Sequence, residues 1–204
     1  MKARSALRLF EISFCIACSC GGSANNVAAT VVGTFNGRSL QAGDAISANV
    51  MAPLGGQQTS VNTGAVVITN NAGLCGLANS NKEPKNSQYL LLLLGDINLA
   101  TGQVTAPTAP GTYSVFTSGM PPPKVALVSY SLTDATCQPI ASAAEESISG
   151  TVTLTTANNG TYAGTFDVNM QGAAQVDHVA GGFNAVNCPA LAPLIGTMRT
   201  TTCI

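Results

Sequence analysis

The stretch SISGTVTLTTANNGTYAGTFDVNMQ, residues 147–171, decides the fold class of this chain. Its first half alternates apolar residues with threonines, and the apolar residues that share one parity are Ile148, Val152 and Leu154. Alternation with a period of two is the pattern of a β-strand with one apolar face and one solvated face. The Asn159-Gly160 pair then predicts a two-residue hairpin turn, because both positions accept a positive φ.

The alternation continues beyond this turn and predicts two further strands. The first of these has an apolar face opposite a polar one, formed by Tyr162, Phe166, Val168 and Met170 against Thr165, Asp167 and Asn169. A looser turn at residues 172–175 leads to the next strand, in which Val179, Phe183 and Ala185 oppose His178, Asn184 and Val186. We therefore expect a three-stranded antiparallel meander with one solvated face.

Short apolar segments between turn residues extend this pattern towards the N-terminus. We expect a tight turn at Asn36-Gly37 and strands over residues 28–35, 39–50, 65–69, 111–116 and 124–132. The segment QYLLLLLGD, residues 88–96, carries five leucines without alternation. This run predicts a strand covered on both faces, with a short buried helix as the alternative. Leu74 and Leu77 lie one turn apart and predict a short helix within residues 71–81.

Together these segments predict an all-β protein. We expect a single antiparallel β-sandwich of about nine or ten short strands over residues 27–204, with a closed β-barrel as the alternative. Irregular strand spacing and the long connection at residues 71–86 favour the sandwich. The chain is 46% hydrophobic, which is enough to fill a core.

The charge content restricts the classes of partner. Only 8% of the residues are charged, against about 25% in an average domain, and the formal net charge is −1. The basic residues are scattered and form no stripe that could neutralise a phosphate backbone. We therefore expect no nucleic-acid partner.

The N-terminus has the organisation of a secretory signal. A basic start and an apolar run at residues 12–17 precede small residues, and the basic residues are Lys2, Arg4 and Arg8. We expect a signal peptide at residues 1–19. Residues 20–26 are glycine-rich and polar, which predicts a flexible tether between this signal and the β-domain.

Several segments together resemble small uncharacterised bacterial lipoproteins that pair a lipobox-like signal with a β-rich body. These segments are CSCGG (18–22), GTFNGRSL (33–40), GTFDVNM (164–170), DHVAGGFNAVNC (177–188) and TTC (201–203). The resemblance implies that one cysteine is lipidated and becomes the first residue of the mature chain. We expect this residue to be Cys20, with Cys18 as the alternative. The resemblance also implies export to the outer membrane of the cell envelope, with secretion without lipid as the alternative.

Counting cysteines favours Cys20 as the lipidated residue. Four cysteines then remain for two disulfides in an oxidising compartment, namely Cys75, Cys137, Cys188 and Cys203. We expect Cys188 to pair with Cys203, which would pin the C-terminal tail, and Cys75 to pair with Cys137. No pair has the spacing of a structural zinc site, so we expect neither a metal nor a cofactor.

Candidate catalytic residues are few. His178 is the only histidine, and Asp177 before it should point to the opposite face of the strand. Glycosidase chemistry needs paired carboxyl groups, and the candidate pairs are Asp167 with Asp177 and Glu145 with Glu146. We expect the first pair to lie on different faces and the second to lie in a solvated loop. The sequence therefore predicts no enzymatic activity.

These observations favour a non-catalytic envelope protein with a binding or structural role. We expect a monomer that is held at the membrane by its N-terminal lipid and contacts a protein or glycan partner. One alternative is a β-barrel carrier of an apolar small molecule, because the leucine run and the low charge suit such a ligand. A carboxylate-based hydrolase is the third candidate.

Replacing Cys20 with Ser should move the protein from the membrane fraction to the soluble fraction, because several buried acyl chains hold a protein far more firmly than one. Metabolic labelling with a fatty-acid analogue measures this directly. The label should persist in Cys18→Ser and disappear in Cys20→Ser. Label lost only from Cys18→Ser would assign the lipid to Cys18, and an unlabelled wild type would indicate secretion without an anchor.

Overall fold

The computed structural model describes residues 28–54, 60–196 and 201–204. Within these residues, strands dominate and helices are short. The strands are β1 (Ala29–Val32), β2 (Asp44–Ala52), β3 (Val61–Thr69), β4 (Lys82–Glu83), β5 (Gln88–Ile97), β6 (Val104–Thr105), β7 (Gly111–Val115), β8 (Lys124–Leu132), β9 (Glu145–Asn158), β10 (Thr161–Gln171), β11 (Val176–Asn187) and β12 (Thr202–Cys203). The helices are α1 (Leu74–Asn79), α2 (Leu191–Gly196) and the 3-10 helix η1 (Ala141–Ala143).

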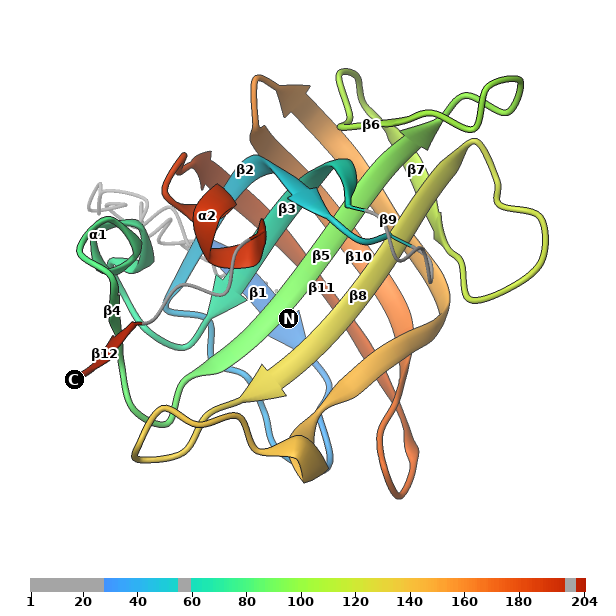
Figure 1. Ribbon diagram of the computed structural model, residues 1–204. Coiled ribbons are helices and arrows are strands. Elements are labelled where there is room, and N and C mark those ends of the chain that lie inside the picture. The colour runs from blue at the N-terminus through green and yellow to red at the C-terminus, as the bar shows by residue number, and fades with distance from the viewer. Residues whose placement is uncertain (1–27, 55–59, 197–200) are drawn as a thin grey trace, which may run out of the picture.

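The larger sheet is one continuous layer that curls on itself (Figure 1). Its hydrogen-bonded order is β1-β11-β10-β9-β7-β8-β5-β3-β2, with β6 paired to β5 and a further pairing between β8 and β9. The curl brings β11 beside β2, where a short parallel pairing joins Val186 to Ile46 and Asn187 to Ser47. A separate two-stranded sheet joins β4 to β12.

The predicted all-β class is confirmed. Inward-facing side chains from nearly every strand of the curled sheet meet in one apolar core, so the two halves of the sheet face each other across it. The sheet is mixed rather than purely antiparallel, because β7–β8 and β11–β2 run parallel. It is not a closed barrel, so this alternative does not describe the fold.

The meander formed by β9, β10 and β11 has the predicted faces. Asn159 and Gly160 have φ values of 47° and 81°, as a tight hairpin turn requires. The predicted apolar faces of β10 and β11 are buried, and the polar faces are more exposed. The register of β10 against β11 is regular from Tyr162 to Gln171.

Ile148 is the exception, and the prediction that it shares the buried face of Val152 is wrong. Its side chain is 42% exposed. The pairing of β9 with β10 shifts register at this point, because Asn169 pairs with Ser149 whereas Met170 pairs with Ser147. The resulting β-bulge turns Ile148 outward and reverses the parity of the residues before it. Glu145 and Ser147 therefore point inward.

Strand β5 is buried on both faces, as the leucine run predicts. Leu90, Leu92 and Leu94 are fully buried in the core within the curled sheet. Leu93 points the other way and packs in a second apolar cluster, which also contains residues of α1 and α2. Strand β5 pairs with β3 along one edge and with β8 along the other, so it has a hydrogen-bonded neighbour on both edges as well as apolar cover on both faces.

The predicted helix at residues 71–81 is confirmed as α1, whereas α2 has no counterpart among the predicted elements. The two first strands are shorter than predicted, because β1 ends at Val32 and β2 begins only at Asp44. The residues between them run along one end of the curled sheet (Figure 1). They contain the predicted turn at Asn36-Gly37, with φ values of 47° and 76°.

The four predicted disulfide cysteines do form two disulfides, but the predicted pairing is wrong. Cys75 is bonded to Cys188, and Cys137 is bonded to Cys203. The parallel contact of β11 with β2 carries Cys188 to α1, where Cys75 lies. The pairing of β12 with β4 carries Cys203 to the connection after β8, where Cys137 lies. Both partners are set by strand pairings between distant segments, and proximity along the chain does not reveal them.

Non-reducing peptide mapping of the purified protein should recover the linked pairs Cys75–Cys188 and Cys137–Cys203. These bonds close loops of 113 and 66 residues, and each should stabilise the fold by on the order of 4–5 kcal/mol in the chain-entropy model. A peptide that links Cys188 to Cys203 would contradict the observed strand pairing of β12 with β4.

Candidate functional site

A pocket of about 440 Å³ lies on the outer face of the sheet, beneath the two α-helices. Outward-facing residues of three adjacent strands form its floor, namely Val67, Tyr89, Leu91, Ser129 and Ser131. The two helices form its apolar walls, through Leu74, Ala78, Leu191, Leu194 and Ile195. Its polar lining comes from β4 and the C-terminal segment, through Lys82, Glu83 and Thr201.

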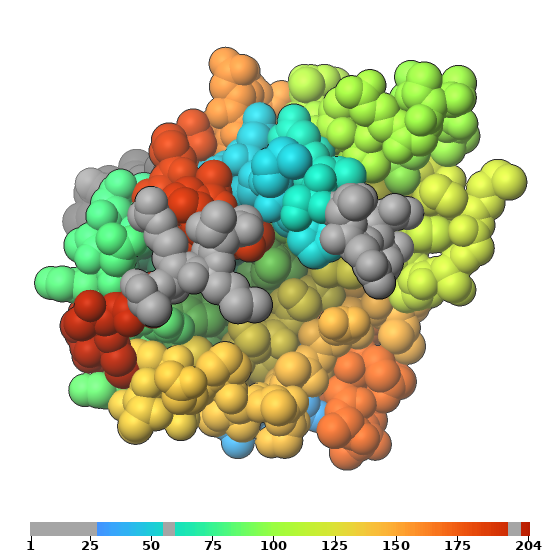
Figure 2. All heavy atoms as spheres, viewed as in Figure 1, coloured from blue at the N-terminus to red at the C-terminus, as the bar shows by residue number. Residues whose placement is uncertain are grey.

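The pocket follows from strands that are apolar on both faces and helices that are short. Val67 and Leu91 are neighbours across β3 and β5, and their side chains need cover on the outer side of the sheet. Each helix has only six residues and so spans about 9 Å at 1.5 Å per residue. The helices shield the edges of this apolar surface and leave a recess between them. In Figure 2 the outer face of β5 and β8 lies recessed between α2 and the segment that follows β8.

The two disulfides hold the walls of this pocket. Cys75 lies in α1, and its partner Cys188 lies three residues before α2 begins, so one bond joins both helical walls. Cys203 lies in β12, which pairs with β4 beside the pocket, and its bond to Cys137 ties this edge to the main sheet. The walls are therefore fixed covalently even though the helices are short.

One end of the pocket is polar. The Thr201 hydroxyl donates a hydrogen bond of 2.8 Å to Oε2 of Glu83. Burial raises the pKa of the neighbouring Tyr89 phenol, and the Glu83 carboxylate raises it further while Ser87 opposes the shift. Tyr89 therefore stays protonated and can donate a hydrogen bond. An apolar recess with a few polar groups at one end is the usual form of a small-molecule site.

A second cluster lies inside the core, where β9 and β11 bring two carboxyl groups together. Glu145 is 1% exposed and Asp177 is 7% exposed. Asp177 accepts hydrogen bonds from the backbone N–H of Asn36, at 2.7 Å, and from Nε2 of Gln175, at 2.6 Å. Burial raises the pKa of Glu145 to about 7, and the nearby Asp177 carboxylate adds to this shift while the Asn36 N–H opposes it. Glu145 is thus protonated below about pH 7 and loses its proton above it.

The carboxyl pairs considered from the sequence are not formed. Asp167 lies on the outer face of β10 whereas Asp177 points inward, as predicted, and Asp167 instead contacts His178 at 2.8 Å. This contact is largely exposed and contributes little stability. Glu146 is exposed on β9, and the prediction that Glu145 lies in a solvated loop is wrong.

The Glu145–Asp177 pair was missed because the bulge at Ile148 changes the parity of β9. Regular alternation from Val152 backwards places Glu145 on the solvated face, whereas the bulge places it on the buried one. A glycine in the strand was the available signal, since Gly150 has a φ of 115° and glycine within a strand often marks a bulge. Cys18 and Cys20 lie outside the described residues.

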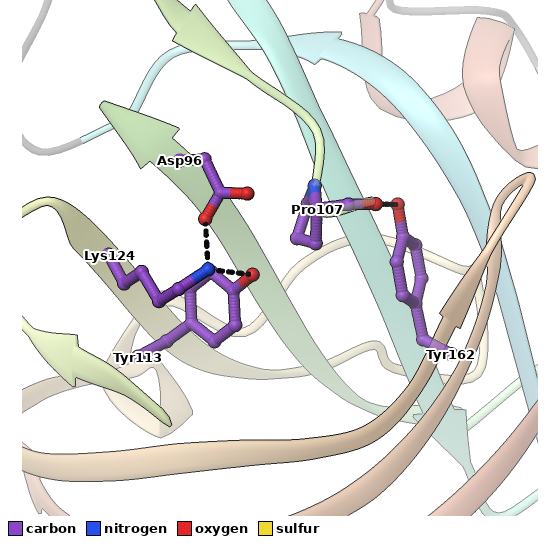
Figure 3. A network of polar contacts seen from close by, with 5 residues as sticks. All are labelled: Asp96, Pro107, Tyr113, Lys124 and Tyr162. Atoms are coloured by element: carbon purple, nitrogen blue, oxygen red, sulfur yellow. Dashed lines mark hydrogen bonds and ion pairs between the residues drawn. The ribbon is translucent and has the colours of Figure 1, made fainter. Parts of the chain in front are cut away.

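A third polar network lies on the edge of the core (Figure 3). Lys124 donates a hydrogen bond of 2.8 Å to Asp96 and another of 3.2 Å to the Tyr113 hydroxyl. The Tyr162 hydroxyl donates to Oδ1 of Asn49 at 2.5 Å and lies 3.4 Å from the Pro107 carbonyl oxygen. Burial raises the pKa of both phenols, so they act as hydrogen-bonding groups.

Among the described ranges, no group of three or more His, Cys, Asp or Glu side chains is arranged to hold a metal ion. A search of those ranges also finds no helix with the length and apolar character needed to cross a membrane. Comparisons with protein-family profiles, curated proteins and solved structures find no match for this chain. Lipidation, partners, oligomeric state and the expected lack of catalysis stay predictions.

The buried Glu145 should make stability depend on pH. Its pKa is about 7 in the fold and 4.5 as a free side chain, so folding retains a proton that the unfolded chain loses. The contribution of this proton to the free energy of unfolding is complete below pH 4.5 and is lost as the pH rises to about 7. The loss is on the order of 3 kcal/mol. Urea unfolding across this range measures the change.

Glu145→Gln should remove this pH dependence, because the amide resembles the protonated acid. Glu146→Gln changes the exposed neighbour on the same strand and should keep the wild-type dependence. Equal pH profiles in the wild type and Glu145→Gln would contradict the assignment.

Proposed function

We propose that this protein is an exported, non-catalytic binding protein of the cell envelope, anchored through Cys20, whose pocket takes an aliphatic small molecule. The observation that carries the proposal is the 440 Å³ pocket between the sheet and the two helices. Its size lies within the range of about 300–1,000 Å³ that small-molecule sites occupy. The two disulfides are compatible with export.

The lining favours an aliphatic ligand over a flat aromatic one. Seven of the lining residues that the structure describes are Val, Leu, Ile or Ala, and Tyr89 is the one aromatic residue of this described lining. Aliphatic side chains adapt to a flexible chain, whereas ring stacking needs aromatic partners. The proposed site lies outside the curled sheet, so this proposal differs from a carrier that encloses its ligand within a barrel.

The polar end suits a ligand with one polar group. Tyr89 can donate a hydrogen bond, and Ser129 and Ser131 add hydroxyl groups on the same face of β8. A buried polar group of a ligand needs such partners, because an unpaired one costs about 1–3 kcal/mol. The ligand class is therefore a small amphipathic molecule with an aliphatic body.

Binding of the fluorescent apolar probe N-phenyl-1-naphthylamine, and its displacement by dodecanol, tests the proposal. Ser129→Phe places a large ring on the pocket floor and should weaken dodecanol binding by at least about tenfold, because an aliphatic body loses the contacts that support it. Thr165→Phe is the matched control on the exposed face of β10 and should bind as the wild type does. Equal loss in both variants, or a wild type that binds neither compound, would contradict the proposal.

Native mass spectrometry of the protein, purified from the cell envelope of the organism that produces it, provides an independent measurement. The expected spectrum contains a second species that is heavier by the mass of one small molecule. That species should be absent from Ser129→Phe and present in Thr165→Phe.

A further inference from the structure

One end of the core is covered by a segment that carries little regular structure, and the buried carboxyl pair lies directly beneath it. We call this segment, residues 33–43, the end connection. Phe35 and Leu40 of the end connection are buried in the core at 0% and 1% exposure. The Phe35 ring stacks on Tyr130 of β8, with centroids 4.1 Å apart and planes within 4°. The end connection is thus an apolar cover over the end of the curled sheet.

A polar contact fixes the position of this cover. The backbone N–H of Asn36 donates to Oδ2 of Asp177, and Gln175 holds the other oxygen of the same carboxylate. Gly172 lies close by, since a Cβ at this position would be 2.5 Å from Oδ1 of Asn36. The side chain of Asn36 therefore occupies space that is free only because residue 172 is a glycine.

Unpaired polar atoms concentrate under the cover. In the described part of the chain, five buried side-chain nitrogen or oxygen atoms lack a hydrogen-bond partner. Four of them belong to this cluster: Nδ2 of Asn36, the hydroxyl oxygen of Tyr130, and both carboxyl oxygens of Glu145. Tyr130 is 1% exposed and is the direct cross-strand neighbour of Glu145. A carboxyl group in such surroundings is tolerated when neutral and is costly when ionised.

Burial and the Asp177 carboxylate oppose the ionisation of Glu145, whereas the Asn36 N–H favours it. Asp177 faces it from β11, and Tyr130 faces it from β8. Arg38 of the end connection acts on the Tyr130 phenol, whose pKa it lowers against the raising effect of burial. An ionised Glu145 would add a second negative charge beside Asp177 in a site that burial removes from water.

We propose that Glu145 and Asp177 form a proton-binding site that controls the end connection. While the pair holds a proton, the end connection stays closed. When that proton is lost to solvent, the end connection opens. On release, the Asn36–Asp177 hydrogen bond breaks, the end connection moves outward, and both carboxylates reach water. The same movement uncovers Phe35, Leu40 and Tyr130. An apolar surface is then presented at neutral to alkaline pH and covered at acidic pH. This inference does not depend on the proposed pocket ligand.

Hydrogen exchange of the full-length protein, followed by mass spectrometry at pH 5.5 and pH 8.5, tests this site. After correction for the intrinsic exchange rate, opening of the end connection should rise about 30-fold between these two pH values. This factor follows from linkage when the pKa of Glu145 is about 7 in the closed form and 4.5 in the open form. The exchange of the Asn36 amide reports it, because this N–H donates to Oδ2 of Asp177 in the closed form. The Asn36 amide should also exchange faster than the amides of β5 at both pH values, because the opening is local.

Two variants separate the proton-binding site from a general effect of pH. Glu145→Gln should stay closed at both pH values, whereas Glu146→Gln should open as the wild type does. Asp177→Asn removes the charge that raises the pKa of Glu145 while keeping an acceptor oxygen, and it should therefore reduce the rise of opening between the two pH values. The proposal is overturned by pH-independent protection in the wild type, by unchanged opening in Glu145→Gln, or by exchange of the end connection at the same rate as β5.

Discussion

Burial of strand β5 on both faces is the constraint on which the rest of the structure depends. A strand whose leucines point in both directions needs apolar cover on each side. The curled sheet supplies it on one side, because its other half closes over Leu90, Leu92 and Leu94. A second apolar cluster, to which α1 and α2 contribute, supplies it on the other side, against Leu91 and Leu93. The core and the pocket are therefore consequences of the same strand, since one lies beneath it and the other above it.

The two sides of this strand are covered in different ways, and the difference explains where a ligand can bind. The inner side is closed by strands that are linked through continuous hydrogen bonding, and large side chains such as Tyr113 and Phe166 fill it. The outer side is covered by two helices of six residues each, which cannot extend over the whole apolar surface. Disulfides compensate for the small contact area of these helices, because a covalent link needs little buried surface to hold its partners.

The inner core has a polar defect at one end, and its position is set by backbone geometry. The bulge at Ile148 rotates the start of β9 and turns Glu145 towards Asp177. A buried carboxyl group remains compatible with folding because it can take up a proton, at a cost that grows with pH. The stability of the core and the closure of its end are thereby coupled to protonation, whereas the pocket on the outer face is formed by groups distant from this pair.

The sequence by itself determined the class of fold, because strand alternation, tight turns and a two-sided apolar run are local patterns that a few consecutive residues can carry. The β9–β10 hairpin, the central strand β5 and helix α1 were all predicted in this way. Only the tertiary structure decided the disulfide partners, the outer pocket and the Glu145–Asp177 pair. Cys188 meets Cys75 through a parallel contact between strands far apart in the chain, and Glu145 faces inward because one extra residue shifts the register of β9. Such pairings and shifts depend on which distant segments pack together. The residues next to a side chain in the sequence do not identify the distant residue that it will contact.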